Sequence, residues 1–110
     1  MIEVFRRYRV HPAQARAFEH AYGATGPWGK FFGRSAGFRR IRLFRHKNEP
    51  QTYVQIQVWE TKSDWEAFLY QYADDYKHLA KELRPLLLEQ ELLGYFEGSA
   101  EYQPPVDTRA

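Results

Sequence analysis

Aromatic and amide side chains alternate along the stretch TYVQIQVWE, which covers residues 52–60. Tyr53, Gln55, Gln57 and Trp59 occupy every second position, so in a strand they lie on one face. Ligand pockets combine large apolar walls with a few polar groups that fix the orientation of the bound molecule. The pattern therefore points to small-molecule binding. The Tyr53 hydroxyl is a candidate proton donor, with simple packing as its alternative role.

A second candidate group is the basic run FRRIRLFR at residues 38–45. Arg42 is a candidate holder of a phenolate or carboxylate, because a guanidinium forms strong charge-assisted hydrogen bonds. The alternative is that Arg42 keeps an edge strand soluble and unpaired. The loop YGATGPWGKFFG, residues 22–33, is also unusual, because it combines four glycines with four aromatic residues where a plain surface connection would be polar.

Composition and spacing exclude several other chemistries. The chain has no cysteine, which rules out a disulfide framework, a thiolate metal site and a cysteine nucleophile. Its four histidines show no metal-ligand spacing with one another or with nearby acids, so no metal site is expected. The glycines at 23, 26 and 29 follow a helix and lead into no long helix, unlike a phosphate-binding loop. No catalytic residue is assigned from these patterns.

The 110 residues suffice for one domain with a real core. The net charge of +2 conceals an asymmetry: residues 1–47 hold eleven basic and two acidic side chains, and residues 48–110 hold five and twelve. A basic half is typical of nucleic-acid binding, but mutual neutralisation across a sheet is the simpler explanation. The N-terminus has no signal-peptide pattern, and no apolar run reaches the roughly 20 residues of a membrane span. We therefore expect a cytoplasmic protein without a membrane partner.

The predicted elements follow a regular order. Hydrophobic periodicity and turn signals predict strands and helices in the order strand, helix, strand, strand, helix, strand. The strands are expected over residues 2–10, 37–47, 52–60 and 88–97, the helices over 12–22 and 64–83. This order predicts a ferredoxin-like βαββαβ fold of the α+β class, an antiparallel sheet with two helices on one face. The domain is expected over residues 1–98, followed by a C-terminal tail, 99–110.

Charges and caps add detail to this fold. Because the first and last strands are neighbours in it, arginines 6, 7 and 9 are expected near glutamates 89, 91 and 97. Ser63 and Glu66 match a capping box at the start of the second helix. Asp74 and Asp75 are a possible interruption midway along it.

The two faces of the sheet are predicted to differ. The apolar rows Ile41/Leu43 and Val54/Ile56/Val58 suit the face that the helices cover. The opposite face is then expected to carry an aromatic and polar row that needs a cover: a second chain, a ligand or a nucleic acid. This row consists of Phe38, Arg40, Arg42, Phe44, Tyr53, Gln55, Gln57 and Trp59.

The succession YRVHP, FEHAYGATGPWGKFF, GFRRIRLFRH, YVQIQVWETKSDWEAF and ELLGYFE resembles the antibiotic biosynthesis monooxygenase-like family of dimeric α+β barrel proteins, over residues 4–97. The resemblance implies a homodimer whose sheets pack into a barrel. It also implies that loop 22–33 lies at the mouth of a pocket between the sheet and the second helix. The ligand-binding residues expected on this basis are Trp28, Phe32, Arg42, Tyr53, Gln55, Gln57, Trp59, Phe68 and Tyr72.

Two activities are implied by relatives in this family. Some are cofactor-free monooxygenases of electron-rich polycyclic phenols, which use asparagine, tryptophan and tyrosine; the single asparagine here, Asn48, lies in a predicted turn. Others degrade haem with asparagine, tryptophan and histidine. In the alignment His78 falls at the histidine position and Phe68 at the tryptophan position, but on a continuous helix His78 faces solvent.

We therefore expect a cofactor-independent monooxygenase-like enzyme, an oxidoreductase that acts on a small hydrophobic aromatic substrate. The first alternative is a non-catalytic small-molecule-binding or accessory dimeric module. The second is a haem-binding or haem-degrading protein. Nucleic acid is not expected as a partner, because TYVQIQVWE lacks the glycine and basic residue of an RNA-recognition strand.

Overall fold

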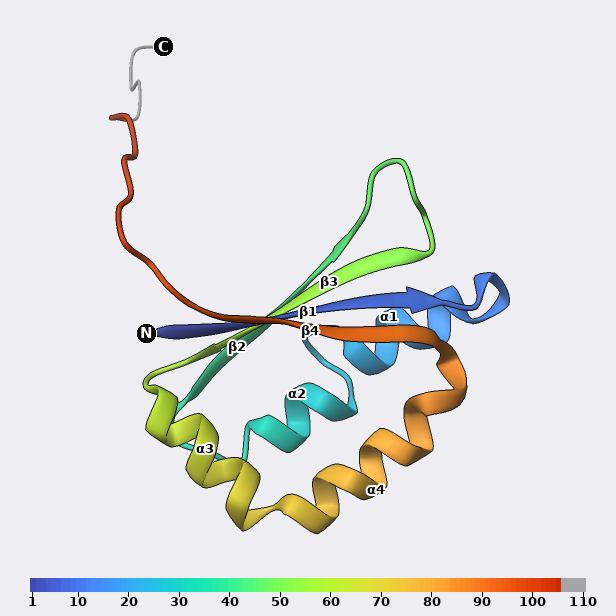
Figure 1. The fold of residues 1–110 in the computed structure, drawn as a ribbon, viewed down its shortest axis with the longest axis horizontal. Helices are drawn as coiled ribbons and strands as arrows, with labels where there is room; N and C mark the ends of the chain where they lie inside the picture. The colour runs from blue at the N-terminus through green and yellow to red at the C-terminus, as the bar shows by residue number, and fades with distance from the viewer. Residues whose placement is uncertain (106–110) are drawn as a thin grey trace.

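A computed structural model describes residues 1–105 of the chain as a four-stranded antiparallel sheet with all helices on one face (Figure 1). The order of elements agrees with the expected ferredoxin-like α+β fold. The strands are β1 (Ile2–Val10), β2 (Phe38–Arg45), β3 (Thr52–Trp59) and β4 (Leu87–Glu97). The helices are α1 (Ala15–Tyr22), α2 (Pro27–Phe32), α3 (Lys62–Gln71) and α4 (Ala73–Leu83), with 3-10 turns η1 (Pro12–Gln14) and η2 (Arg84–Leu86).

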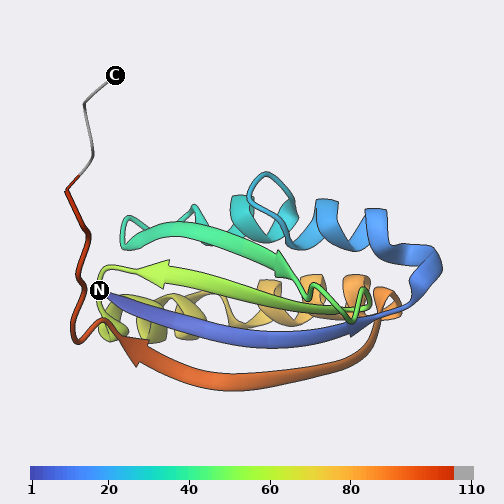
Figure 2. The same cartoon turned by 90° about the horizontal axis from the view of Figure 1, so that it is seen from above.

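The strand order is β2-β3-β1-β4, so the first and last strands pair as predicted (Figure 2). Arg7 and Arg9 on β1 form ion pairs with Glu89 and Glu91 on β4, at N–O distances of 2.9 Å for Arg7–Glu91 and 3.2 Å for Arg9–Glu89. The expected neutralisation across the sheet is confirmed for these two arginines. Arg6 takes no part in it, because it points to the other face.

The second helical segment is divided where the sequence left a choice. Its N-cap is Thr61, whose hydroxyl accepts a hydrogen bond from the Asp64 backbone N–H at 3.1 Å, so the expected Ser63–Glu66 capping box is wrong by two residues. The break falls at Tyr72, just before the expected Asp74-Asp75 interruption. His78 stays exposed after the break, with Nδ1 3.1 Å from the carbonyl oxygen of Asp74.

The predicted face of β3 is wrong. Tyr53, Gln55, Gln57 and Trp59 face the helices and are at most 2% exposed, whereas Val54, Ile56 and Val58 lie on the opposite face. The reason is volume. The helices present large aromatic rings, and the two rings of β3 bury more area against them than valine would. The glutamines between them tolerate burial because they are hydrogen-bonded.

On β2 the prediction is partly right. Ile41 and Leu43 face the helices as expected. Phe38 does too, with its ring centroid 5.3 Å from that of Trp59, because an irregularity between Phe38 and Arg40 shifts the register and turns Phe38 over. Arg40, Arg42 and Phe44 stay on the far face with Val54, Ile56 and Val58.

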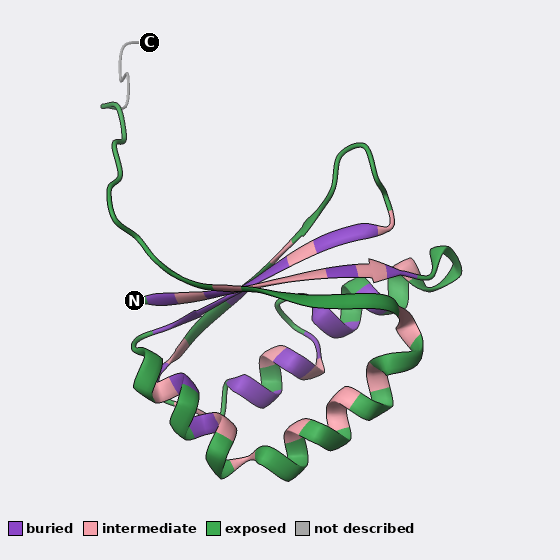
Figure 3. Cartoon of the chain, viewed as in Figure 1, coloured by how far each residue is buried: buried purple, intermediate pink, exposed green. Residues whose placement is uncertain are grey.

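Helices α1, α2 and α3 cover the sheet closely, whereas α4 covers it less completely. Rings from α1, α2 and α3 are buried against β3 and β2, whereas all eleven residues of α4 are half-buried or exposed (Figure 3). On β4 only Leu87 and Gly94 are half-buried and the rest are exposed. The interior is therefore least covered between α4 and the β1–β4 pair.

The C-terminal end of the chain leaves the sheet after Glu97. Residues 98–105 are in neither helix nor strand, and residues 106–110 of the predicted tail lie outside the described residues. The boundary at residue 98 stays a prediction. Within residues 1–105, no helix combines the length and apolar character that crossing a membrane requires.

Candidate functional site

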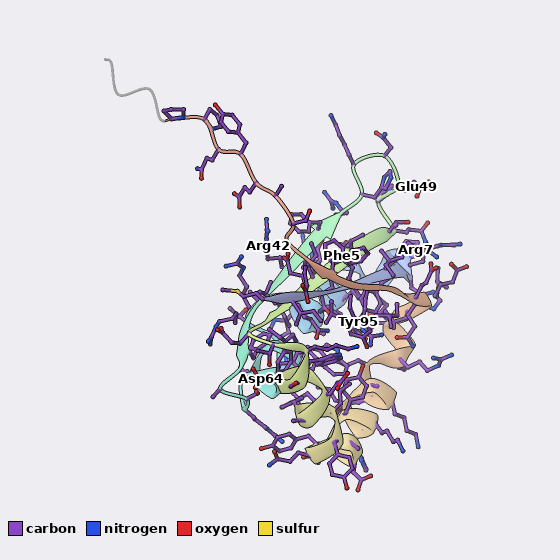
Figure 4. All side chains as sticks on the ribbon, turned by 60° about the vertical axis from the view of Figure 1, so that its left-hand side comes forward. Phe5, Arg7, Arg42, Glu49, Asp64 and Tyr95 are labelled. Carbon is purple, nitrogen blue, oxygen red and sulfur yellow. The ribbon has the colours of Figure 1, made fainter. Side chains whose placement is uncertain are left out.

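Eight of the nine residues predicted to bind a ligand face the interior between sheet and helices. Arg42 is the exception. It lies on the far face of β2, where its guanidinium carbon is 4.9 Å from the ring centroid of Phe44 (Figure 4). The other eight candidates therefore lie on the helix-covered side of the sheet, and Arg42 lies on the opposite side.

A hydrogen-bonded ladder joins three of these residues along β3. Trp59 Nε1 donates to Gln57 Oε1 at 3.4 Å, Gln57 Nε2 donates to Gln55 Oε1 at 3.1 Å, and Gln55 Nε2 donates to the Tyr22 carbonyl oxygen at 2.8 Å. The period-2 geometry of a strand puts the three side chains in one row. The ladder satisfies buried amides and ties the end of α1 to the sheet, so its role here is positional.

The aromatic candidates Phe32, Trp59 and Phe68 form a closed cluster at the α2–α3 end. Their ring centroids lie 5.4–5.7 Å apart, and each is at most 3% exposed. Tyr72 packs on Phe68 at 4.8 Å at the rim of this cluster. Close mutual packing fits a core that fixes α2 and α3 on the sheet.

Tyr53 lies at the other end of β3. Its hydroxyl donates to the Glu19 carboxylate at 2.8 Å. Burial raises the pKa of Tyr53, and the Glu19 hydrogen bond and charge raise it further, so the hydroxyl stays protonated. A surface hollow of about 250 Å³ adjoins it, with walls from Val10, Pro12 and Arg45 among others.

A second polar group on the helix-covered side of the sheet is a cluster of five residues from four elements, which we call the Arg6 cluster. It consists of Arg6 and Tyr8 on β1, Tyr22 on α1, Trp28 on α2 and Tyr76 on α4. Ring centroids are 4.9 Å apart for Tyr8–Tyr22, 6.0 Å for Tyr22–Trp28 and 5.2 Å for Trp28–Tyr76. Of these, only Trp28 was among the predicted ligand-binding residues.

Two buried donors in this cluster lack a well-aligned acceptor. Arg6 Nε and Trp28 Nε1 are shielded from solvent, and neither makes a hydrogen bond of good geometry within residues 1–105, although the Trp28 N–H lies next to the Tyr22 hydroxyl. Each such donor carries a desolvation cost of about 1–3 kcal/mol. Buried polar groups are satisfied in the great majority of cases, so two such donors in one cluster make it a candidate site.

Two tyrosines of the cluster, Tyr8 and Tyr22, are held in the neutral form. Burial raises the pKa of Tyr8 far above its ordinary value, with the Arg6 charge opposing the rise and Tyr22 and Tyr76 adding to it. Burial also raises the pKa of Tyr22, and the neighbouring Trp28 N–H and the Arg6 charge oppose it. The Arg6 charge therefore acts on both hydroxyls, and the Trp28 N–H on that of Tyr22. At neutral pH Tyr8 and Tyr22 offer protonated hydroxyls near one guanidinium.

Strand β4 is irregular where it passes Arg6. Phe5 pairs with Gly94 and Arg6 with Leu92, so Leu93 is an extra residue on β4. Gly94 has a φ of 143°, which L residues rarely adopt. Bulges are over-represented next to active sites, where they re-aim side chains. Here the bulge adjoins the loosely covered side of the interior.

Sequence reasoning missed Arg6, Tyr8, Tyr22 and Tyr76 as site residues. A signal for Arg6 is present in the sequence. Even positions of the first strand are Ile2, Val4, Arg6, Tyr8 and Val10, so Arg6 is the one charge in an otherwise apolar row. The convergence of the three tyrosines has no such signal, since it depends on how α1 and α4 pack on β1.

Groups of three or more histidine, cysteine, aspartate or glutamate side chains that could hold a metal ion do not occur among residues 1–105.

Comparison with known proteins shows which family the chain resembles. A search of curated proteins found no match. Among solved structures, the chain is similar to SnoaB, a cofactor-independent oxygenase from Streptomyces nogalater, with 26% identity, coverage of 91% of this chain and 94% of that one, and a TM-score of 0.66, or 0.69 for a SnoaB variant.

A protein from Bordetella bronchiseptica that carries the antibiotic biosynthesis monooxygenase name is 20% identical and has a TM-score of 0.70, with coverage of 90% of this chain and 97% of that one. At that identity the likeness concerns the fold. The family model described as antibiotic biosynthesis monooxygenase matches residues 1–79, well over half of the chain. The chain belongs to the antibiotic biosynthesis monooxygenase family.

Proposed function

We propose that the protein is a cofactor-independent oxygenase that binds a small hydrophobic aromatic substrate in the interior beside the Arg6 cluster. The observation that carries the proposal is the pair of orphaned donors, Arg6 Nε and Trp28 Nε1, set among aromatic rings. Apolar walls with a few convergent polar groups are typical of ligand sites. The similarity to SnoaB supports oxygen chemistry as the reaction.

The reaction can be written with the substrate as the sole reductant. An activated CH2 group of an electron-rich polycyclic substrate loses a proton, and the resulting anion reduces O2. One oxygen atom becomes a carbonyl oxygen on that carbon, and the other leaves as water. The four electrons given up by the CH2 group are the four that O2 accepts, so no further reductant is needed.

The residues of the cluster suit this reaction in two ways. Their neutral hydroxyls and N–H groups can orient an oxygen-bearing ring, and fixed donors in a dry site stabilise charge that develops during reaction. The loosely covered side between α4 and β4 is the proposed route of entry.

The assembly we propose is a homodimer that covers the far face of the sheet. Apolar side chains gather there without a helix above them: Phe5, Phe44, Val54, Ile56 and Phe96. Phe44 and Phe96 are 44% and 48% exposed, and Phe5 packs edge-on against Phe96 at 4.8 Å. Exposed apolar patches of this kind usually mark interfaces. A cytoplasmic location, consistent with the lack of cysteine, belongs to the same proposal.

The test combines melting temperatures with oxygen consumption. Polycyclic phenols and hydroquinones, haemin and short RNA strands are added to the purified protein, and each ligand that raises the melting temperature is followed with an oxygen electrode. At a hundredfold excess over its dissociation constant, a ligand that binds the native state adds about 2.7 kcal/mol of stability. We expect aromatic ligands to stabilise the protein and at least one to consume O2.

Matched variants locate the site. Tyr76→Phe removes one hydroxyl from the Arg6 cluster, and Tyr70→Phe removes one from a residue that is 90% exposed. We expect Tyr76→Phe to reduce the rate of oxygen uptake and Tyr70→Phe to leave that rate unchanged. Binding without oxygen uptake by any ligand would instead favour the non-catalytic module, and stabilisation by haemin alone the haem-binding protein. Stabilisation by RNA alone would contradict the small-molecule site.

A further inference from the structure

We propose that Arg6 makes the interior selective for aromatic ligands that carry an ionised oxygen, which its guanidinium holds. The inference rests on the proposed function, because it assumes that a small aromatic molecule enters the interior. The inference goes beyond the proposed function because it names the charge state of the bound ligand and the residue that selects this charge state.

The first argument is the position of the charge. Arg6 lies in the helix-facing row of β1, between Val4 and Tyr8 along the strand, opposite Gln55 on β3 and Leu92 on β4. Its neighbours Arg7 and Arg9 are ion-paired with glutamates. Among residues 1–105, no carboxylate forms an ion pair with Arg6. Of the three arginines on β1, Arg6 is therefore the one that faces the helices, half-buried and with its Nε shielded from solvent.

The second argument is what surrounds the guanidinium. The titratable groups that act on its neighbourhood are the hydroxyls of Tyr8, Tyr22 and Tyr76, from β1, α1 and α4. Burial raises the pKa of Tyr8 and Tyr22, so these two do not supply a negative charge at neutral pH. The amide of Gln55, opposite on β3, already accepts from Gln57 and donates to Tyr22. None of these groups supplies a negative charge to the half-buried guanidinium, which leaves it free to hold an anionic ligand.

The third argument is energetic. A charge in a low-dielectric interior is costly unless it is paired, and the same low dielectric strengthens its attraction to an anion. An aromatic ligand with an ionised phenol, enol or carboxylate supplies that anion together with an apolar ring. A neutral ligand of equal shape gains only the apolar contacts.

The experiment uses three probes of nearly equal shape: 4-nitro-1-naphthol, which ionises with a change of colour, 1-naphthoate, which is always charged near neutral pH, and 1-nitronaphthalene, which carries no ionisable group. Affinity is measured by titration of tryptophan fluorescence. The ionisation of bound 4-nitro-1-naphthol is followed by absorbance as a function of pH. We expect binding to lower the apparent pKa of the phenol by about 1–3 pH units, as an opposite charge nearby does.

The variants separate charge from shape. Arg6→Gln should weaken the two charged probes by about tenfold to a hundredfold, the range for hydrogen bonds to charged groups, and leave 1-nitronaphthalene within about twofold. Arg6→Lys, which keeps the charge, should restore part of the affinity. Arg9→Gln, the same change on the opposite face of the same strand, is the control and should change none of the three.

The outcomes separate the two proposals. If only 4-nitro-1-naphthol depends on Arg6, the held oxygen is phenolic; if 1-naphthoate depends on it equally, any aromatic anion suffices. Both results support the inference. If all three probes bind wild type and Arg6→Gln equally, the inference is wrong but the proposed ligand site is supported. If none binds wild type, the proposed site and the inference are both wrong.

Discussion

At the scale of single residues, Arg6 stands out because its side chain forms no ion pair and its Nε no hydrogen bond within the described residues. Its Nε is buried without an acceptor within the described residues, whereas Arg7 and Arg9 are paired on the surface. Functional sites are where proteins depart from the rules that favour stability. A residue kept at a cost in folding free energy is best explained by what it binds.

This argument predicts that Arg6→Met stabilises the free protein. The substitution removes a half-buried guanidinium whose shielded Nε has no acceptor, and it keeps most of the side-chain volume, so we expect the free energy of unfolding to rise by about 1–3 kcal/mol. Urea denaturation of both proteins measures the difference. Arg9→Met is the control and should be neutral or slightly destabilising, because it loses an exposed ion pair. A less stable Arg6→Met protein would show that Arg6 has a partner the contacts do not reveal.

The site shows the limit of sequence reasoning most clearly at this scale. The alternation in β3 correctly grouped Tyr53, Gln55, Gln57 and Trp59 on one face, but the choice of face was wrong. Hydropathy ranks valine and isoleucine above glutamine for burial. The outcome depends instead on the rings across the interior and on the ladder that satisfies the two amides. Neither can be read from β3 alone.

At the scale of elements, sequence reasoning was more successful. Strand and helix order, the β2–β3 hairpin and the pairing of β1 with β4 follow from periodicity, turn residues and charge complementarity. The sequence misplaced two features, the orientation of Phe38, which a register shift turns over, and the cap at Thr61, and it did not predict the bulge in β4. Each of these features shifts a strand or helix by one or two residues, and a hydrophobic periodicity is too coarse to reveal so small a shift.

The bulge in β4 gives the element-scale prediction. Gly94 adopts a φ of 143°, so Gly94→Ala is strained even though a Cβ there would meet only ordinary contacts with Phe96. We expect a loss of about 1–3 kcal/mol in the free energy of unfolding, measured by chemical denaturation. Gly98→Ala is a matched control, because a Cβ at that position has open space. Equal stability of the two variants would mean that β4 accommodates a regular ladder at Gly94.

At the scale of the whole molecule, the sheet has two apolar faces and only one helix layer. The second face carries Val54, Ile56 and Val58, of which Ile56 and Val58 are already largely buried by their neighbours. Because the sheet carries apolar residues on both faces, the face without helices needs a cover, and a second chain in the proposed homodimer provides it.

The corresponding prediction concerns mass in solution. The 13.1 kDa chain should sediment as a dimer, and Ile56→Lys, which places a charge at the centre of the far face, should convert it to a monomer. Circular dichroism of the variant checks that the fold is kept. Tyr70→Lys, on the exposed side of α3, should leave the dimer intact. A monomeric wild type at micromolar concentration would contradict the sheet-to-sheet assembly.

The order β2-β3-β1-β4 also constrains when the domain can be completed during its synthesis. The central strand β1 is made first, yet one of its two partners, β4, is made last, with residue pairs such as Ile2 and Glu97 joined across nearly the whole domain. Strands so distant in the chain pair slowly, because closing the long loop between them costs entropy before any contact stabilises the pair. The hairpin of β2 and β3 is local and can form early. The nascent chain therefore carries an unpaired edge of β1, including the strand segment around Arg6, until its final strand arrives.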